Sequence, residues 1–233
     1  MQEKIKICIA TIKTWNFVNL AKFINNYSDV YDIYVCKLEK ELSYQFLKSI
    51  NPDYIFFPHW SWIIDKDIYE NFKCVLFHIT DLPYGRGGSP LQNLILKGKK
   101  KTKISAIKVS KDLDAGDIYS KDSLCIDKES AQEIFQKVSD IIFFKMIPNI
   151  IRNNTCPKPQ KGIVTFFKRR TPEQSNILNA ELKNMAQFYD FIRMLDAESY
   201  PKAFIKYKNF TIEFNKAEIK NNEINGRFRI IEE

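Results

Sequence analysis

The sequence is poor in glycine and poorer in histidine, with seven glycines and two histidines among 233 residues. No GxGxxG dinucleotide fingerprint follows the first apolar run, which continues as ATIKTWNF over residues 10–17, and no GxxxxGK[ST] phosphate loop is present. Binding of a nucleotide cofactor by a glycine-rich loop is therefore disfavoured. The run KGKKKTK at residues 97–103 resembles a phosphate loop only in its lysines, and we interpret it as a solvated turn.

Paired cysteines and long apolar runs are also missing. The five cysteines are widely spaced and contain no CxxC pair, which argues against a disulfide framework and against a zinc site, so we expect reduced, mostly buried thiols and no metal. The longest apolar stretch, residues 54–64, is interrupted by Pro58 and His59 and is shorter than the roughly 20 residues of a membrane helix. No signal-peptide pattern opens the chain. These absences predict a cytoplasmic protein without a membrane partner.

The composition predicts a folded protein but selects no partner. Hydrophobic residues make up 45% of the chain and aromatic residues 14%, enough for a substantial core. The formal charge of +8 would suit nucleic acid, a membrane surface or a small anion, but acidic residues are interleaved with the lysines. Charge alone does not decide among these partners.

The first half of the chain alternates between strand and helix patterns. Buried strands are predicted at residues 4–10, 31–36, 53–57 and 74–77. A helix after the first strand places Phe17, Leu20, Ala21 and Ile24 on one face, with Thr14 as its cap, and a second helix is predicted over 38–50. This order predicts an α/β fold: a Rossmann-like, mostly parallel sheet with helices on both faces.

The second half predicts a mixed edge to this sheet and then a small appendage. We expect a helix at 90–96, two neighbouring strands at 104–109 and 118–126, and a long helix that begins at a Ser130–Glu133 capping box and ends near Pro148. Further elements are a helix at 186–195 and strands at 203–207, 210–214 and 228–232. We divide the chain into a catalytic domain (1–155), a linker (156–180) and a small α+β C-terminal subdomain (181–233).

Residues 77–90, FHITDLPYGRGGSP, concentrate three of the glycines and one histidine in the loop that follows the fourth strand. Loops at the carboxyl ends of parallel strands are where open α/β sheets bind ligands. His78 is the candidate acid–base residue, and it needs an acid to orient it. Asp81 in the same loop and Asp114 in the turn KDLDAGDIY are the two candidates, and Asp81 fits better as a turn residue ahead of Leu82-Pro83.

Four segments, in order, resemble the formyltransferases that use N10-formyltetrahydrofolate. HITDLPYGRGGSP is similar to the His-x-Ser-Leu-Leu-Pro loop and Arg-Gly-x-x-Pro turn of that family, and DAGD is similar to its Asp-x-Gly-Asp turn. FKRRTPEQSNI (167–177) and the segment 191–209 are similar to the family's Arg-Arg-Thr-Pro linker and Pro-Tyr-Pro-Gly-Ala-Phe region. The resemblance covers most of the chain and implies formyl transfer from N10-formyltetrahydrofolate, without a metal.

The resemblance assigns roles to particular residues. His78 would act as the catalytic base, held in one tautomer by Asp114. Arg86 with Gly87 and Gly88 would bind the acceptor substrate. The remaining expected site residues are, for the acceptor, Lys13 and Trp15, and, for the folate, His59, Trp60, Ser61, Trp62, Leu113 and Asp117.

The sequence also departs from the family pattern. An Asn that helps to bind the oxyanion lies two residues before the catalytic His in most members, and here this position is Leu76. A related branch, the hydrolase domain of formyltetrahydrofolate dehydrogenase, has an aliphatic residue there. The oxyanion donor is therefore unassigned, and His59 is a candidate to supply it.

The resemblance leaves three acceptors open: methionyl-tRNA, glycinamide ribonucleotide and a nucleotide-linked amino sugar. The tRNA enzymes carry a larger basic C-terminal domain than the segment available here, so the resemblance is taken to be greatest to nucleotide-sugar N-formyltransferases of surface-glycan synthesis. The expectation is an amino-sugar acceptor, no nucleic-acid partner and a possible homodimer. The alternatives are methionyl-tRNA formylation, hydrolysis of formyltetrahydrofolate, and a non-catalytic protein that binds folate or nucleotide.

Overall fold

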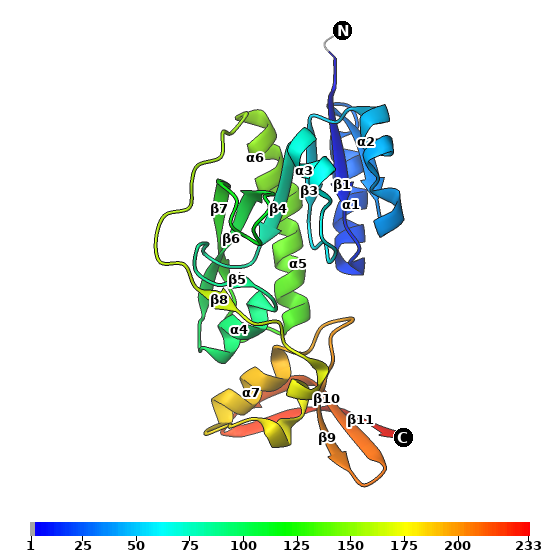
Figure 1. The fold of residues 1–233 in the computed structure, drawn as a ribbon. Helices are drawn as coiled ribbons and strands as arrows, with labels where there is room; N and C mark the ends of the chain where they lie inside the picture. Colours follow the sequence, from blue (N-terminus) through cyan, green and yellow to red (C-terminus); the bar gives the residue numbers. More distant parts are fainter. Residues whose placement is uncertain (1–2) are drawn as a thin grey trace. The chain divides into compact units, whose positions relative to one another are not determined.

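A computed structural model describes residues 3–233 (Figure 1). Within this range the chain forms two compact units, each built from segments that are separated in the sequence. The first unit runs to Arg86 and adds residues 103–123 and 136–165, and the second contains residues 87–102, 124–135 and 166–233. The domain limits expected from the sequence, with a linker over 156–180, stay a prediction.

The first unit is built around a six-stranded sheet. Its strands are β1 (Ile5–Ala10), β2 (Tyr31–Cys36), β3 (Tyr54–Phe57), β4 (Cys74–His78), β6 (Lys101–Lys108) and β7 (Ile118–Cys125). They lie in the order β2-β1-β3-β4-β6-β7. The first four are parallel, and β6 runs antiparallel to β4. This arrangement confirms the predicted Rossmann-like, mostly parallel fold.

Helices cover both faces of the sheet because successive strand residues point to opposite sides. The helices of the first unit are α1 (Thr14–Tyr27), α2 (Tyr44–Ile50), α3 (Lys66–Asn71), the part of α5 (Ala131–Ile141) from residue 136 onward, η2 (Ile142–Met146) and α6 (Ile147–Arg152). On one face, Leu47 of α2 and Ile68 of α3 pack with Cys8 of β1 in a buried cluster. On the other face, the ring of Phe23 of α1 lies 5.8 Å from that of Phe143 in η2.

The buried face of α1 differs from the predicted one. Asn16, Asn19 and Leu20 are buried, whereas Ala21 and Ile24 are exposed. The Asn19 amide donates to Ser139 Oγ at 3.0 Å and Asp140 Oδ1 at 2.7 Å. Because buried amides that form hydrogen bonds lose little on leaving water, these asparagines can occupy the core side in place of apolar residues. Lys13, and not Thr14, is the cap residue of this helix.

Two predicted helices have different limits in the structure. The segment predicted as one helix over 38–50 forms a short 3-10 turn, η1 (Glu39–Glu41), and then α2, whose first turn is capped by a 3.2 Å hydrogen bond from the Phe46 amide to Ser43 Oγ. The long helix starts at the predicted Ser130–Glu133 capping box. It does not end at Pro148, because a π-helical turn leads into α6 and Pro148 occupies a first-turn position where no amide donor is required.

The second unit contains α4 (Pro90–Leu96), α7 (Met185–Arg193) and an antiparallel three-stranded sheet. The sheet has the order β11-β10-β9, with β9 at Ala203–Tyr207, β10 at Phe210–Lys220 and β11 at Glu223–Glu232. These elements confirm the predicted small α+β C-terminal subdomain. Short elements complete the chain: β5 (Arg86–Gly87), β8 (Phe166–Phe167), η3 (Pro172–Ser175) and η4 (Ile177–Asn179).

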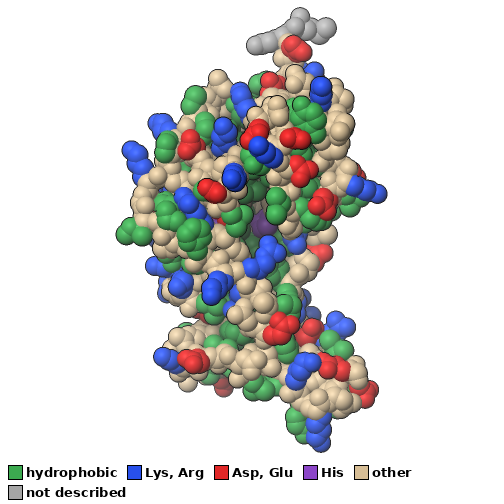
Figure 2. Space-filling model, viewed as in Figure 1, with side chains coloured by type: hydrophobic (Ala, Val, Ile, Leu, Met, Phe, Trp, Pro, Cys, Tyr) green, Lys and Arg blue, Asp and Glu red, His purple; other side chains and the backbone are tan. Residues whose placement is uncertain are grey.

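Across residues 3–233, every helix is too short or too polar to cross a bilayer. The five cysteines are all free, with Cys8, Cys36 and Cys74 buried and Cys125 and Cys156 exposed. Three of the five thiols are thus buried, as the sequence predicted for most of them. On the face shown in Figure 2, lysine and arginine side chains are interspersed with acidic ones.

Candidate active site

His78 and Asp114 form a buried pair in the first unit. His78 is the last residue of β4, and its Nδ1 lies 3.5 Å from Oδ1 of Asp114, which comes from the turn between β6 and β7. The two side chains are 8% and 5% exposed. A histidine can be seen at the bottom of a recess on the face shown in Figure 2. The structure thus brings together the two residues that the sequence predicted as catalytic.

Both ring nitrogens of His78 face acceptors. Nε2 lies 2.8 Å from the carbonyl oxygen of Gly85, and a carbonyl can only accept, so Nε2 carries a proton in this arrangement. On the opposite side of the ring, Nδ1 faces the Asp114 carboxylate. The ring is therefore held at both ends, as an acid–base histidine with a fixed orientation requires.

The turn that carries Asp114 has a demanding backbone. Asp114 has a φ of 52°, in the left-handed region that few non-glycine residues adopt. At Gly116 a Cβ atom would lie 1.7 Å from the carbonyl oxygen of Lys108, so only glycine fits. These two positions bend the chain so that the Asp114 carboxylate reaches His78.

The loop after His78 is held by hydrogen bonds to Ser105 of β6. The hydroxyl of Ser105 donates to the carbonyl oxygen of Thr80 at 2.7 Å and accepts from the amide of Leu82 at 3.3 Å. Both Ser105 and Thr80 are fully buried. One serine thus satisfies two backbone groups of a buried loop, which explains why the loop can leave β4 at a defined angle.

Asp81, the other acid considered as a partner for His78, is engaged elsewhere. Its carboxylate forms a 3.0 Å ion pair with Lys103 and a second ion pair with Lys121. Burial alone would raise the pKa of Asp81, but hydrogen bonds and charge from the two lysines outweigh it and lower the pKa overall. Asp81 therefore anchors the loop to β6 and β7, and Asp114 alone faces His78.

Arg86 and the two glycines after it contact other parts of the protein. The Arg86 guanidinium donates from Nε and Nη2 to Oε1 of Gln160, at 3.2 and 2.8 Å. The space beside Gly87 is filled by the carbonyl oxygen of Phe167 and that beside Gly88 by Arg169, at 2.4 and 2.5 Å from where a Cβ would be. The glycines thus permit close approach of a neighbouring chain segment. Acceptor binding by these residues stays a prediction.

Three predicted site residues meet at the ends of β1 and β3. Trp15 is buried, and its ring lies edge-on to that of His59 at 5.4 Å, while Lys13 Nζ lies 5.5 Å from the Trp15 ring centre. The carbonyl of Pro58, just before His59, accepts hydrogen bonds from Thr11 Oγ1 at 2.7 Å and from Asn16 Nδ2 at 3.1 Å. Burial lowers the pKa of His59 to about 4, and the charge of Lys13 contributes in the same direction. His59 is therefore neutral at physiological pH.

The other predicted folate residues differ in exposure. Trp60 is half-buried between Phe57 and Trp62, and its indole N–H is buried without a partner. Trp62 is 38% and Leu113 69% exposed, Ser61 is exposed and Asp117 is half-buried. Leu76, at the position of the family's Asn, packs against the buried cluster under α2 and α3 and has no donor to offer. Folate binding by these residues stays a prediction.

Gln160 and Lys121 are site neighbours that the sequence did not reveal. Gln160 donates to the carbonyl oxygens of Asp114 at 2.8 Å and Gly116 at 2.9 Å. Lys121 donates to the carbonyl oxygen of Leu82 besides pairing with Asp81. Both residues lie far along the chain from the groups that they contact, and no local pattern marks them.

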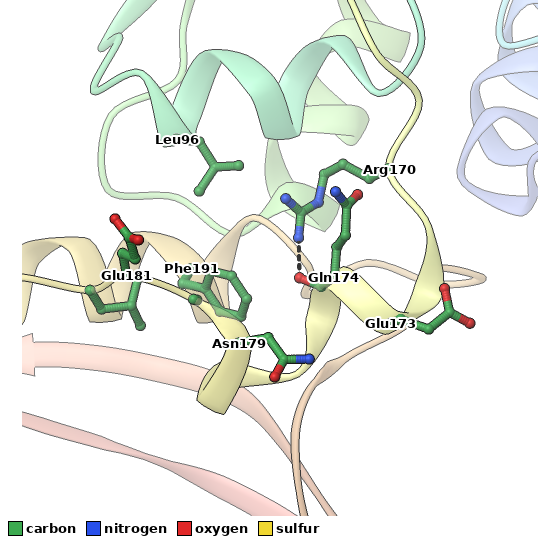
Figure 3. A pocket seen from close by; sticks show the side chains of 9 residues that line it. Leu96, Arg170, Glu173, Gln174, Asn179, Glu181 and Phe191 are labelled. Carbon is green, nitrogen blue, oxygen red and sulfur yellow. Dashed lines mark hydrogen bonds between the residues drawn. The ribbon is translucent and has the colours of Figure 1, made fainter.

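A separate cavity of about 340 Å³ lies in the second unit (Figure 3). The Arg170 guanidinium lies over the Phe191 ring at 5.8 Å and donates to the carbonyl oxygen of Gln174. Burial lowers the pKa of Arg170. The lining residues are Leu96, Arg170, Glu173, Gln174, Asn179, Ala180, Glu181, Leu182 and Phe191. This cavity contains neither histidine nor cysteine and so offers no acid–base or nucleophilic pair comparable to His78 and Asp114.

Among the described residues, histidine, cysteine, aspartate and glutamate side chains do not gather in any group of three or more that could hold a metal ion. The first unit brings together the imidazole of His78, the carboxylate of Asp114 and backbone hydrogen-bonding groups. This set is suited to proton transfer during the attack of an amine on an acyl carbon.

Comparison with known proteins identifies relatives along the whole chain. Residues 35–148 match the formyl transferase family model, and residues 172–231 match the model described as the C-terminal domain of methionyl-tRNA formyltransferase. The structure of methionyl-tRNA formyltransferase from Clostridium thermocellum is 50% identical, with a TM-score of 0.94, and the match covers 98% of this chain and 100% of that one.

More distant relatives are larger proteins. A methionyl-tRNA formyltransferase from Rickettsia bellii is 26% identical over 81% of this chain, and the chain spans 62% of the length of that relative. HypX from Aquifex aeolicus, in complex with tetrahydrofolic acid, shares the fold at 17% identity and a TM-score of 0.74, covering 95% of this chain and 40% of HypX.

These relatives overturn two predictions from the sequence. The amino-sugar acceptor and the absence of a nucleic-acid partner were both inferred from the small size of the C-terminal part. That inference was wrong, because this short part matches a methionyl-tRNA formyltransferase C-terminal domain and the 50% identical relative of equal length is itself named for that activity. About sixty residues, folded as a helix and a three-stranded sheet, are therefore compatible with the tRNA branch.

The two family models lie on the two halves of the fold in the expected order, and the 50% identical structure extends the match over nearly every residue between them. The predicted enzyme class is confirmed by this agreement. The chain belongs to the formyltransferase family.

Proposed function

We propose that the protein transfers the formyl group of N10-formyltetrahydrofolate to the amino group of methionyl-tRNA. The observation that carries this proposal is the full-length match, at 50% identity, to the methionyl-tRNA formyltransferase of Clostridium thermocellum. The buried His78–Asp114 pair supplies the acid–base group that the reaction requires. The folate donor is supported by the family and by the tetrahydrofolate complex of HypX, which has the same fold.

His78 would move the proton in this reaction. The amine nitrogen attacks the formyl carbon and forms a C–N bond, and the carbonyl becomes an oxyanion. The intermediate then collapses by breaking the bond from the formyl carbon to N10, and the proton lost by the amine ends on N10. His78 can accept this proton at Nε2 in the tautomer that has its proton on Nδ1, facing Asp114, when the substrate amine replaces the Gly85 carbonyl as the partner of Nε2. Asp114 stabilises the imidazolium formed in between.

The oxyanion requires a donor other than residue 76. Leu76 is apolar and packs into the core, so it cannot replace the missing amide. His59 is neutral, and its N–H is a suitable hydrogen-bond donor near neutral pH. We propose that His59 supplies this donor. His59→Gln keeps an N–H donor and His59→Phe keeps only the ring, so the proposal expects kcat to fall by about a hundredfold in the phenylalanine variant alone. Equal activities of the two variants would contradict it.

A basic patch in the second unit suits the phosphates of tRNA. The patch consists of exposed side chains from the turn after α4 and from the segment after β8: Lys97, Lys99, Lys101, Lys168 and Arg169. Lys97 Nζ lies 6.0 Å from the Phe167 ring centre, and Asn93 donates to the carbonyl oxygen of Lys168 at 3.1 Å, so the two segments are neighbours. Clustered cations of this kind bind a phosphate backbone through counterion release.

The activity is tested by mass spectrometry on the acceptor. Purified protein, N10-formyltetrahydrofolate and methionyl-tRNA are incubated, with His78→Ala protein and with buffer as controls. The proposal expects formylmethionyl-tRNA with the wild-type chain only. Formate release without an acceptor would instead identify a hydrolase, and binding of folate without turnover would identify a binding protein; either result overturns the proposal.

The basic patch is tested separately by salt dependence. Gln substitutions of Lys97, Lys101 and Lys168 are expected to raise the Kd for methionyl-tRNA and to lower the slope of log Kd against log salt by about one per residue. Lys66→Gln is the matched control, since Lys66 is an exposed lysine paired with Glu70 on α3 in the first unit. An unchanged slope in the triple variant would remove the patch from the tRNA interface.

A further inference from the structure

Residues 158–165, named here the strap, run back along the first unit. Lys158 exchanges backbone hydrogen bonds with Ile118 at 2.7 and 2.9 Å. At the other end, the Thr165 amide donates to the carbonyl oxygen of Pro83, and the Thr165 carbonyl accepts from the Arg86 amide at 2.9 Å. The strap is thereby fastened both to the strand that follows the Asp114 turn and to the loop that follows His78.

Thr165 also fixes the group that holds the His78 ring. Its Oγ1 accepts from the Gly85 amide at 2.7 Å, and the Gly85 carbonyl lies 2.8 Å from His78 Nε2. One end of the strap therefore determines the position of the Gly85 carbonyl, which is the hydrogen-bond acceptor on the Nε2 side of the imidazole.

Gln160, in the middle of the strap, contacts the other side of the pair. Its amide nitrogen donates to the carbonyl oxygens of Asp114 and Gly116, at 2.8 and 2.9 Å. Its amide oxygen accepts both Arg86 bonds. Arginine can only donate and a carbonyl can only accept, so these partners fix which way the amide points.

The chemical requirements at this position are met by glutamine in particular. Two backbone carbonyls need a donor with two N–H groups, and a guanidinium needs an acceptor on the opposite side. A glutamate would direct an oxygen at the carbonyls, and an apolar side chain would satisfy neither side. The Asp114 turn has a left-handed residue and a glycine in tight contact with Lys108, so it depends on outside contacts to keep its shape.

We propose that Gln160 is a positioning residue, which holds the Asp114 turn so that the carboxylate meets His78 and which orders Arg86 at the same time. Gln160 acts through the pair and takes no part in bond making. Its kinetic consequence rests on the proposed formyl transfer. Because a displacement of about 1 Å in a catalytic group can cost a hundredfold in rate, loss of the contacts from Gln160 to the Asp114 turn lowers kcat.

Two variants separate the two sides of the bridge. Gln160→Met keeps the length of the side chain and removes both sets of hydrogen bonds. Gln160→Glu keeps an acceptor for Arg86 and removes the donors for the two carbonyls. The control is Gln136→Met, an exposed glutamine on α5. Both Gln160 variants are expected to lower kcat by about ten- to a hundredfold, and KM is expected to stay within about twofold of wild type in Gln160→Glu, which keeps the contact to Arg86.

A second readout does not need turnover. The chain has two histidines, so an ¹⁵N-histidine spectrum contains two imidazoles, and His59→Gln assigns them. The ¹⁵N and ¹H shifts of the His78 ring are expected to change in both Gln160 variants and to stay at their wild-type positions in Gln136→Met. If methionyl-tRNA is not the formyl acceptor, or N10-formyltetrahydrofolate is not the formyl donor, no turnover is measured for any variant, wild type included. The spectra then still decide the role of Gln160.

Specific results would overturn this role. Wild-type activity and wild-type His78 shifts in Gln160→Glu, with losses in Gln160→Met alone, would show that the contact to Arg86 matters and the contact to the Asp114 turn does not. A fall in kcat with unchanged His78 shifts would equally exclude an action through the pair. Circular dichroism melts of each variant identify any general loss of folding, and Gln160→Glu carries the test if Gln160→Met does not fold.

Discussion

The carboxylate of Asp114 faces Nδ1 of His78 at 3.5 Å, whereas Asp81, only three residues from His78 in the chain, is turned toward Lys103 and Lys121. Proximity in sequence is thus a poor guide to the partner of this histidine. The distinction has a chemical basis, because an acid already neutralised by two lysines has little charge left to stabilise an imidazolium. Asp114 is shielded from solvent and faces the imidazole, so its charge is available to stabilise an imidazolium.

Removing the acid of the pair should reduce turnover without unfolding the protein. Asp114→Asn keeps the shape of the side chain and removes its charge, so kcat is expected to fall by about a hundred- to ten-thousandfold. The measurement is the initial rate of formyl transfer at saturating substrates. Asp112→Asn, an exposed neighbour in the same turn, should retain wild-type activity. Similar rates for Asp114→Asn and wild type would exclude Asp114 from catalysis.

The two glycines Gly116 and Gly98 should respond differently to alanine. Gly116→Ala places a Cβ against the Lys108 carbonyl, so the turn must move, and a loss of about 2–4 kcal/mol in the free energy of unfolding is expected together with loss of activity. Gly98 has a φ of +66° but no atom within 4 Å of its Cβ position, so Gly98→Ala should cost only about 1 kcal/mol from backbone strain. Urea titration measures both. Equal costs would mean that the close contact at Gly116 relaxes freely.

Arg193 should be a main contributor to the stability of the second unit. It is 4% exposed, pairs with Asp190 at 2.6 Å, and donates to the carbonyl oxygens of Ile126 and Glu129. Arg193→Met leaves a carboxylate and two carbonyls without this partner, so a loss of about 2–4 kcal/mol in unfolding free energy is expected. The exposed pair of Lys66 and Glu70 gives the comparison, and Lys66→Met should cost less than about 1 kcal/mol. Comparable losses for the two variants would contradict this assignment.

His59 should make stability depend on pH in a defined window. Burial, with the charge of Lys13, lowers its pKa to about 4 in the folded chain, against 6.5 for an ordinary histidine. Between these two pH values the folded state binds fewer protons than the unfolded state. The contribution of neutral His59 to the free energy of unfolding is therefore fully present above pH 6.5 and is lost as the pH falls toward 4.

The corresponding measurement compares urea unfolding at pH 7 and pH 5. Wild type should lose about 1–2 kcal/mol more than His59→Gln over this interval. Asp81 does not interfere, because its pKa is lowered from 3.8 and its contribution is lost only at more acid pH. An identical pH response of the two proteins would place His59 in a more hydrated environment than the structure indicates.

The strand–helix alternation predicted the fold because helices cover both faces of the sheet and the parallel strands β1, β3 and β4 each contain a run of buried apolar residues. The inner face of α1 could not be predicted in the same way. Periodicity assigns apolar residues to the core, but Asn16 and Asn19 are buried there because their amides meet partners on Pro58, Ser139 and Asp140. Such partners lie in other parts of the chain, and no local rule detects them.

The candidate site shows the same limit. His78 and Asp114 could be predicted because each lies in a short motif with a fixed spacing. Gln160 and Lys121 contact the same loops from segments with no motif of their own, and their roles became visible only when the chain was folded. The acceptor was mispredicted for a related reason: the length of the C-terminal part was used as a measure of its binding capacity, although its exposed residues decide what it binds.

The position of the strap in the sequence affects the order in which the candidate active site can form during synthesis. The first unit is assembled from three stretches of chain, the last of which ends at Thr165. During synthesis the residues that seat His78 and Asp114 leave the ribosome well before Gln160 and Thr165 do. The candidate active site is therefore completed by a segment that is synthesised late, so a truncated or stalled product that ends before residue 160 would contain His78 and Asp114 and still lack the contacts that align them.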